Sequence, residues 1–224
     1  MGKDKLKRFS ELNKFENVIQ PEIKYDDSHH NIKGKWREEF KLKNPIVLEL
    51  GCGGGEYTIG LARLFKKKSF IGIDIKGARI WKGAKIAKED NIYNVRFLRT
   101  KVEFIEKFFD KNEVEEIWLT FSDPQKKKPR KRLTSPNFMD RYKKILNENG
   151  TINLKTDSHI LYQYTLDLIQ KNNYKLIHDI PDVYKDIHKL HYDLKNILAI
   201  KTFYEEKWLK DNKSIKYLSF KVNS

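Results

Sequence analysis

The segment PIVLELGCGGGE, residues 45–56, decides the fold. It begins as a short apolar run and ends in a turn, residues 51–55, in which four of the five residues are glycine. Residues 58–67 follow with apolar side chains at helical spacing. A strand, a glycine turn and a helix in this order predict the first unit of an α/β protein.

The same alternation of strand and helix patterns continues along the 224 residues. We predict strands at 45–50, 69–75, 95–98, 114–121, 151–156, 174–180 and 215–222, and helices at 58–67, 78–89, 102–109, 137–146 and 158–171. Such alternation predicts a mostly parallel sheet, here of seven strands, with helices on both faces. We expect one domain over residues 34–224, preceded by a basic, weakly patterned arm over residues 1–33.

Two features at the ends of predicted strands indicate a site for a cofactor that contains adenosine. Ligands of such sheets bind at the carboxyl ends of the strands, where Asp74 ends the second strand and can accept both hydroxyls of a ribose. A dinucleotide fingerprint needs a third glycine at the position of Glu56, whose charge would repel a pyrophosphate. S-adenosylmethionine is cationic and has no phosphate, so it fits Glu49 and the turn from Gly51 to Gly55 better. A dinucleotide, or a turn that binds nothing, are the alternatives.

Two further carboxylates follow the fourth and fifth predicted strands. Asp123 lies in Ser122-Asp123-Pro124, where the proline restricts the acid to extended backbone and so fixes where it points. Asp157 follows the fifth strand, and we predict that the two acids clamp a base that donates and accepts hydrogen bonds. The alternative is a helix cap, which suits Asp157 better because a loop of about a dozen residues separates Asp123 from the next helix.

The loop after Asp123 is strongly basic. It contains six cations: Lys126, Lys127, Lys128, Arg130, Lys131 and Arg132. The whole chain has 46 Lys and Arg against 31 Asp and Glu, a formal net charge of +15. A basic cluster beside a predicted cofactor site favours contact with a nucleic acid. The alternative is a solvated charge run in a chain that is rich in lysine throughout.

Several other classes of protein are disfavoured. The single cysteine, Cys52, excludes an internal disulfide and a cysteine-based zinc cluster, and the six histidines lack a regular ligand spacing, so no metal is predicted. No apolar run approaches the roughly 20 residues of a membrane span. The first residues also lack the apolar core of a secretory signal. We therefore expect a cytoplasmic protein with no membrane partner.

Taken together, the motifs resemble the bacterial tRNA (guanine-N(7)-)-methyltransferases, which are class I S-adenosylmethionine-dependent enzymes with a Rossmann-like α/β fold. The resemblance covers residues 34–224 and rests on LELGCG (48–53), IGID (71–74), FSDPQ (121–125), KRL (131–133), KTD (155–157) and TFYE (202–205), in the order of the family. The glycine motif alone indicates only a class I methyltransferase, whereas the later motifs are more specific. Gln125 is a departure, because the family usually has tryptophan there.

The resemblance implies methyl transfer from S-adenosylmethionine to N7 of a guanosine in the variable loop of tRNA. Asp123 would be the catalytic residue. The implied cofactor residues are Glu49, Gly51, Gly53, Asp74, Thr100 and Asp123, and the implied substrate residues are Lys127, Asp157, Thr202, Phe203, Tyr204 and Glu205. Thr100 would replace the acid that many class I enzymes place near the adenine amino group.

The remaining expectations concern assembly and rival activities. We expect a monomer or a homodimer. Another methyltransferase of the same fold, acting on rRNA, a protein or a small molecule, is one alternative. A catalytically silent RNA-binding protein that keeps the sheet is the other.

Overall fold

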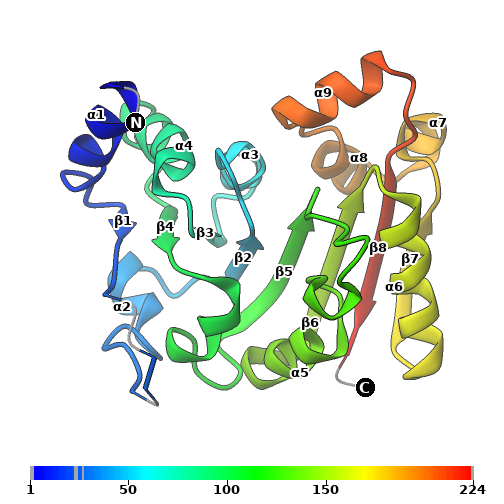
Figure 1. Cartoon of the computed structure of the whole chain (residues 1–224), viewed down its shortest axis with the longest axis horizontal. Coiled ribbons are helices and arrows are strands. Elements are labelled where there is room, and N and C mark those ends of the chain that lie inside the picture. The colour runs from blue at the N-terminus through cyan, green and yellow to red at the C-terminus, as the bar shows by residue number, and fades with distance from the viewer. Residues whose placement is uncertain (1–2, 23–24, 27, 223–224) are drawn as a thin grey trace. The chain divides into compact units, whose positions relative to one another are not determined.

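The computed structural model describes residues 3–22, 25–26 and 28–222. They fold into two compact units that divide between Asp110 and Lys111. Each unit contains a sheet and several helices (Figure 1). The alternation of strand and helix that the sequence predicted is therefore confirmed.

The first unit holds a parallel sheet in the strand order β1-β4-β3-β2. Its strands are β1 (Val18–Ile19), β2 (Ile46–Leu50), β3 (Ser69–Asp74) and β4 (Val95–Arg99), and its helices are α1 (Lys3–Leu12), α2 (Trp36–Phe40), α3 (Glu56–Leu64), α4 (Gly77–Glu89) and the 3₁₀ helix η1 (Val102–Lys107). All residues of β2 and β3 are buried. Strands covered on both faces explain why their sequences read as continuous apolar runs.

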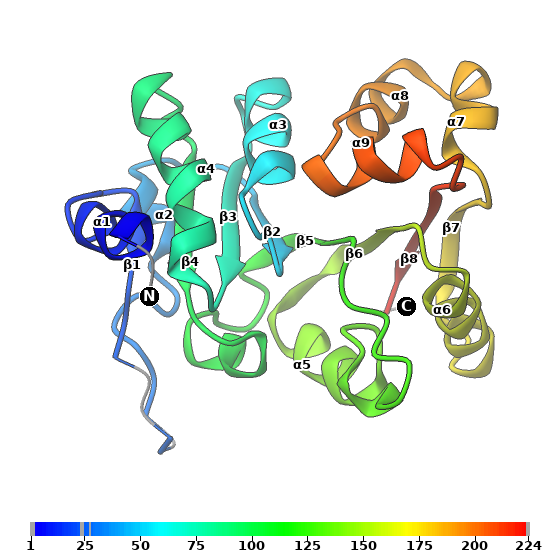
Figure 2. The ribbon, with the colours of Figure 1, turned by 45° about the horizontal axis from the view of Figure 1, so that its top comes forward.

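The described part of the N-terminal arm has regular structure within the first unit. Helix α1 lies beside α4, as Figures 1 and 2 show, and Trp81 Nε1 donates a 2.7 Å hydrogen bond to Glu11 Oε2. Leu12 is buried, and the Asn17 side-chain amide donates to the carbonyl of Ala84 at 3.0 Å. The boundary near residue 33 stays a prediction, and residues 1–2, 23–24 and 27 of the arm lie outside the described part.

The second unit holds a mixed sheet in the strand order β5-β6-β8-β7. Its strands are β5 (Val114–Thr120), β6 (Leu146–Thr156), β7 (Lys175–Ile180) and β8 (Lys216–Lys221); β5 and β6 are parallel, and β8 is antiparallel to both β6 and β7. Its helices are α5 (Pro136–Ile145), α6 (His159–Lys171), α7 (Val183–Asp186), α8 (Tyr192–Leu198), α9 (Phe203–Lys210) and the 3₁₀ helices η2 (Pro129–Lys131) and η3 (Ile187–Lys189). Helices α7, α8 and α9 gather near the carboxyl end of β6 in both views (Figures 1 and 2).

Two expectations about secondary structure need correction. The described residues form eight strands and not seven, because Val18–Ile19 adds a short parallel strand to β4. Two residues are too few for a periodic pattern, so this strand could not be predicted. The helix predicted over 102–109 is the 3₁₀ helix Val102–Lys107. None of the described helices is long and apolar enough to cross a membrane.

Candidate active site

The glycine turn after β2 has the backbone geometry that its sequence demands. Gly51, Gly53 and Gly55 have φ angles of 77°, 57° and 73°, a region that residues with a side chain rarely adopt. The amides of Gly51 and Cys52 both donate to the carbonyl of Ile73, at 2.8 and 3.0 Å. The turn is thus fastened to the end of β3. A Cβ added at Gly53 would meet no atom within 4 Å, so the backbone there faces open space.

Three glycines from different elements close around the ring of Phe97. A Cβ built at Gly55, Gly72 or Gly83 would come within 2.6 to 2.7 Å of a ring carbon of Phe97. Phe97 itself is fully buried in β4. Helix α4 and the glycine turn therefore approach the sheet closely only because these positions lack side chains. Gly72 within a strand and Gly83 within a helix were the signals available in the sequence, since glycine inside an element marks close approach.

Asp74 joins the glycine turn to the start of α4. Its Oδ2 accepts a hydrogen bond from the amide of Gly53 at 3.0 Å, and its Oδ1 accepts from the amide of Lys76 at 2.7 Å. A carboxylate has about four lone-pair sites, so two remain after these bonds. Asp74 can therefore hold the turn and still accept hydrogen bonds from a ligand.

Glu49 is buried and acts on the first turn of α3. Its Oε2 accepts hydrogen bonds from the amide of Thr58, at 2.8 Å, and from the Thr58 hydroxyl. A carboxylate at a helix N-terminus is also favoured by the helix dipole. Burial, followed by the negative charges of Glu49 and Asp74, raises the pKa of the Cys52 thiol. Cys52 is therefore a packing residue and not a nucleophile.

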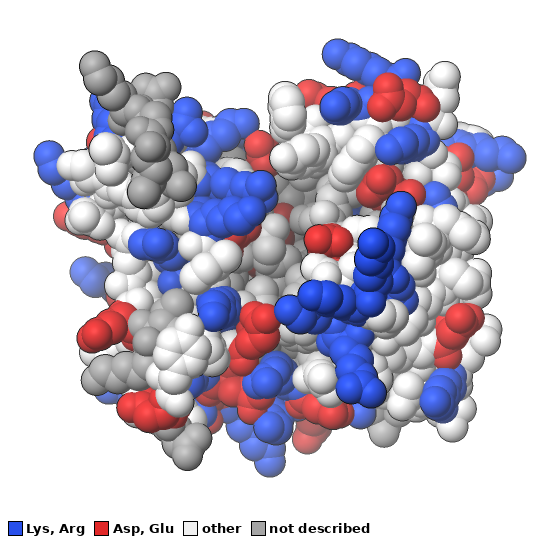
Figure 3. All heavy atoms as spheres, in the orientation of Figure 1, with Lys and Arg blue, Asp and Glu red and all other residues white. Residues whose placement is uncertain are grey.

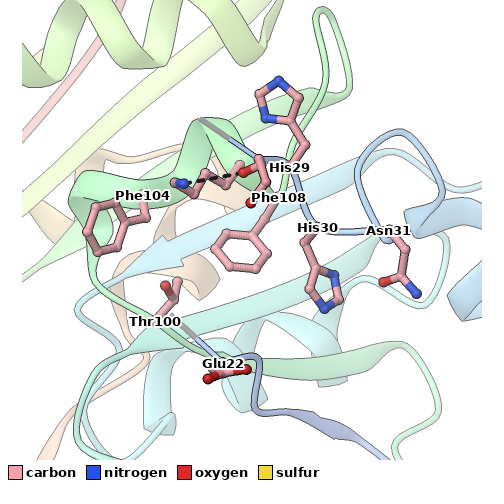
Figure 4. Close-up of a pocket in the computed structure, with 9 residues that line it drawn as sticks. Glu22, His29, His30, Asn31, Thr100, Phe104 and Phe108 are labelled. Atoms are coloured by element: carbon pink, nitrogen blue, oxygen red, sulfur yellow. Dashed lines mark hydrogen bonds between the residues drawn. The ribbon is translucent and has the colours of Figure 1, made fainter. Parts of the chain in front are cut away.

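Thr100 follows β4 and lines a cavity of about 370 Å³ within the first unit. Figure 4 shows the rings of Phe104 and Phe108 beside it, with Glu22 and His30 contributed by the N-terminal arm. The Thr100 side chain is fully buried, and its Oγ1 has no hydrogen-bond partner among the residues that the structure describes. A buried hydroxyl without a partner is costly, which suggests that a ligand or water completes it.

In the second unit, Asp123 lies on an exposed turn directly after β5. Its Oδ1 accepts a hydrogen bond from the amide of Gln125 at 2.8 Å. The turn is flanked by two residues with positive φ, Phe121 at 50° and Gln125 at 45°. Such backbone is uncommon outside glycine and tends to occur at functional sites. The carboxylate is therefore held by its own loop and presented to solvent.

The basic loop, defined as residues 126–132, is anchored by the last of its six cations. Arg132 is only 6% exposed, its Nε donates to the carbonyl of Pro124 at 2.8 Å, and its guanidinium lies 4.3 Å from the ring centre of Tyr164. Arg132 is therefore covered, although the sequence places it among the cations predicted to contact a nucleic acid. The other five are exposed, and a band of Lys and Arg atoms runs along the drawn face of this unit in Figure 3.

Asp157 follows β6 and is not the cap of the next helix. Ser158 is the N-cap of α6, and its hydroxyl accepts from the amide of Leu161 at 3.2 Å. The amide of Phe121 donates a 2.8 Å hydrogen bond to the carbonyl of Lys155. Asp123 lies two residues after Phe121, and Asp157 lies two residues after Lys155. The structure thus brings the two acids to neighbouring strand ends, as predicted.

The segment from Thr202 to Glu205 divides into two kinds of side chain. Thr202 caps α9: its hydroxyl accepts from the amide of Glu205 at 3.2 Å, and Glu205 Oε2 accepts from the amide of Thr202 at 3.4 Å. Glu205 is fully buried, whereas Phe203 and Tyr204 are 64% and 51% exposed. Phe203 and Tyr204 are therefore the two members of this segment whose side chains a partner can reach.

Comparison with known proteins decides the family. A family model described as "Putative methyltransferase" matches residues 43–218. The chain is 50% identical over 223 residues to a tRNA (guanine-N(7)-)-methyltransferase of Bacteroides fragilis, which covers 98% of this chain and 86% of that protein. It is 49% identical over 225 residues to the enzyme of the same name from Christiangramia forsetii, with 99% of both chains covered. The chain belongs to the tRNA (guanine-N(7)-)-methyltransferase family.

Solved structures similar to this tRNA (guanine-N(7)-)-methyltransferase family member are more distant and show the fold alone. A 16S rRNA methyltransferase, KamB, is 12% identical with a TM-score of 0.64, over 93% of this chain and 99% of that one. A methyltransferase from Aquifex aeolicus described as SAM-dependent is 14% identical with a TM-score of 0.54, over 94% and 96%. The predicted class I methyltransferase fold is therefore confirmed.

Several contacts that shape the site of this family member were missed by sequence reasoning, although Lys155 and Arg132 lie in motifs that it used. Lys155 and Tyr184 contact Glu205, and Arg132 anchors the basic loop. Glu205 is distant in the chain from Lys155 and Tyr184, and Tyr164 is distant from Arg132, so no local pattern could reveal these contacts. Among residues 3–22, 25–26 and 28–222, no group of three or more His, Cys, Asp or Glu side chains could hold a metal ion.

Proposed function

We propose that this protein transfers a methyl group from S-adenosylmethionine to N7 of a guanosine in the variable loop of tRNA. The observation that carries the proposal is the identity of about half of all residues, over nearly the whole chain, with enzymes named tRNA (guanine-N(7)-)-methyltransferase. The motifs of the second unit add support, because Asp123, Asp157 and the basic loop suit a guanine base and its phosphates.

The residues of the first unit fit the methyl donor. The carboxylate of Asp74 keeps lone pairs for the two ribose hydroxyls, and the backbone at Gly53 leaves open space for the donor. The unpartnered Thr100 Oγ1 would accept from the adenine amino group. Glu49 would add negative charge that favours the cationic donor, whose sulfonium supplies the methyl group. We infer cofactor roles for Glu49, Gly51, Gly53, Asp74 and Thr100 on these grounds.

The residues of the second unit suit a guanosine. N7 of guanine already has an exposed lone pair, so its methylation needs no strong general base. Asp123 and Asp157 would accept hydrogen bonds from the ring N–H and the amino group of guanine. Two carboxylates placed there raise the electron density of the base and stabilise the positive charge that develops on it. Phe203 and Tyr204 would stack on unpaired bases, as aromatic side chains do in RNA recognition.

The decisive test is transfer of labelled methyl to tRNA transcripts. We expect labelling of a transcript that has the variable-loop guanosine and only background labelling of a transcript with adenosine at that position. Equal labelling of both would contradict the proposal and favour another methyltransferase of this fold. Calorimetry with S-adenosylhomocysteine distinguishes a silent RNA-binding protein, which would not bind this product of the donor.

The basic loop provides a second prediction, concerning affinity for tRNA. Changing Lys126, Lys127 and Lys128 together to alanine should weaken binding, because each lysine that neutralises a phosphate releases counterions. The slope of log K against log salt should fall in magnitude by about 0.7 to 0.9 for each lysine in contact. Filter binding at several salt concentrations measures this slope.

A matched control exists in the first unit. Lys66, Lys67 and Lys68 are three consecutive lysines outside the basic loop, and their change to alanine removes the same charge. We expect this control to alter the slope much less. An equal loss from both triplets would mean that only net charge matters and that Lys127 has no specific role.

We further infer a cytoplasmic location, with tRNA as the partner, and we expect a monomer or a homodimer.

A further inference from the structure

Lys155 is a fully buried cation at the carboxyl end of β6. Its ammonium Nζ lies 2.7 Å from Glu205 Oε1, and it donates to the carbonyls of Leu198 and Ile200 at 2.8 and 2.9 Å. A lysine ammonium has three donors, and these three contacts use all of them. The side chain therefore ties β6 to the end of α8, to the segment after it and to α9.

Glu205 is equally buried, and it gathers a second set of contacts. The hydroxyl of Tyr184, in α7, donates to Glu205 Oε1 at 2.8 Å. The other oxygen, Oε2, closes the capping box with Thr202. The ion pair of Lys155 and Glu205 is thus the point at which β6, α7 and the start of α9 are joined.

The same pair reaches the turn that carries Asp123. The carbonyl of Lys155 accepts from the amide of Phe121, and the Lys155 ammonium lies 5.8 Å from the centre of the Phe121 ring. Phe121 is the residue of positive φ at the start of that turn. Asp157 lies two residues after Lys155 on the same strand. A displacement of Lys155 would therefore move both acids.

An aromatic row provides a second connection between α9 and this turn. Tyr204 stacks on Trp208 with ring centres 5.8 Å apart, and Trp208 contacts Phe121 with ring centres 5.1 Å apart. The exposed ring of Tyr204 is thereby packed, through one tryptophan, against the residue that begins the Asp123 turn. Glu205 sets the orientation of α9, and the contacts from Tyr204 through Trp208 to Phe121 connect α9 to the end of β5.

We propose that Lys155 and Glu205 form a positioning pair that fixes Asp123, Asp157 and the exposed rings of Phe203 and Tyr204 for the substrate base. This inference rests on the proposed function. A buried ion pair is poor evidence for stability, because apolar residues of similar volume often stabilise a fold as well or better. What the pair supplies here is geometry, since each of its contacts goes to a segment that is predicted to meet the substrate.

The test removes the charges and keeps the shape. In the double variant Lys155→Met with Glu205→Gln, the glutamine oxygen can still accept from the amide of Thr202 in the capping box, and its NH₂ group can donate to the hydroxyl of Tyr184, so the chain is expected to fold. Single-turnover methylation of tRNA should fall about 100-fold, because a misplacement of about 1 Å in a reacting group costs that much. Affinity for S-adenosylhomocysteine, which depends on the first unit, should stay within about twofold.

A matched control lies in the same sheet. Tyr217 is buried in β8, and its hydroxyl donates to Asn153 Oδ1 at 2.8 Å. Tyr217 lies opposite Lys155 in the ladder between β6 and β8, but the bond that its hydroxyl makes goes to Asn153 and not to the ion pair. Tyr217→Phe should therefore lower thermal stability but leave the methylation rate unchanged. If the double variant loses thermal stability but keeps its methylation rate, as the control is expected to do, Lys155 and Glu205 are merely structural and the proposal fails.

The pH dependence of the rate separates positioning from stability. Burial lowers the pKa of Lys155 from 10.5 to about 8; Glu205 opposes this shift, and the nearby charge of Lys201 adds to it. Burial also raises the pKa of Tyr184, which stays neutral in this range. The pair should therefore lose its positive member, and the wild-type rate should fall, as pH rises through about 8.

The contribution of Lys155 to stability has the opposite sign. Between pH 8 and 10.5 the unfolded chain holds the lysine proton more tightly than the folded chain, so this group favours folding more as pH rises. A methylation rate that falls as pH rises through about 8, while Lys155 adds to the free energy of unfolding, would therefore indicate a positioning role. The double variant should lack this alkaline fall in rate. An unchanged fall, or a wild-type rate in the double variant, would overturn the positioning role alone, whereas no labelling by the wild type would overturn the proposed function.

Discussion

Replacing Asp123 with asparagine is expected to lower the single-turnover rate of tRNA methylation by about 100-fold, the loss typical of removing one group that stabilises charge in a transition state. Asparagine keeps Oδ1, so the bond from the amide of Gln125 and the shape of the turn should survive. What is lost is the negative charge that faces the developing purinium cation. Rapid-quench measurement with saturating enzyme and donor isolates this step from binding.

The control for this variant is Asp140→Asn. Asp140 is another exposed aspartate of the second unit, in α5, and its change removes the same charge. Its rate should stay within about twofold of the wild type, as is usual for surface substitutions. A rate for Asp123→Asn within a fewfold of the wild type would remove Asp123 from the reaction centre. Calorimetry on the same variant tests its additional predicted contact with the cofactor.

The sequence predicted the parts of the site that depend on local order along the chain. Buried parallel strands read as apolar runs, and ligand residues follow them, so Asp74, Asp123 and Asp157 could be located before their surroundings were known. The prediction did not extend to side chains whose partners are distant in sequence. Lys155 and Glu205 are separated by 50 positions, and the motifs that contain them, 155–157 and 202–205, give no sign that the two side chains pair.

Burial of charge explains the other differences. In the sequence, Arg132 is the last member of a basic run that is otherwise exposed. In the structure it is buried, because its guanidinium contacts the ring of Tyr164 and donates to the carbonyl of Pro124. Both contacts form only in the folded unit, so the sequence of the basic loop alone could not predict them. Glu205 was implied as a substrate residue by its motif, and its full burial favours a positioning role beside the exposed Phe203 and Tyr204. Within this motif, Phe203 and Tyr204 are then available for contact with the substrate, and Glu205 supports them.

Asp74→Asn should weaken the binding of S-adenosylhomocysteine by about 100-fold, which corresponds to about 2.8 kcal/mol at 1.4 kcal/mol for each factor of ten. The carboxylate accepts from the amides of Gly53 and Lys76 through different oxygens. In asparagine one of these oxygens becomes an NH₂ group, which cannot accept, so one amide loses its partner and the glycine turn loosens. A ribose hydroxyl that donates to this oxygen would likewise lose its acceptor. Isothermal titration calorimetry measures the change directly.

Asp90→Asn is the matched control for this prediction, because Asp90 ends α4 in the same unit and pairs with Arg63 at the surface. Exposed ion pairs contribute little, so its affinity for the cofactor product should match the wild type. If Asp74→Asn also binds normally, the ribose does not depend on Asp74, and its carboxylate serves only to close the turn. If both variants bind weakly, the loss reflects the reduced negative charge of the first unit. The affinity for S-adenosylhomocysteine would then depend on the overall electrostatic field and not on a direct contact with Asp74.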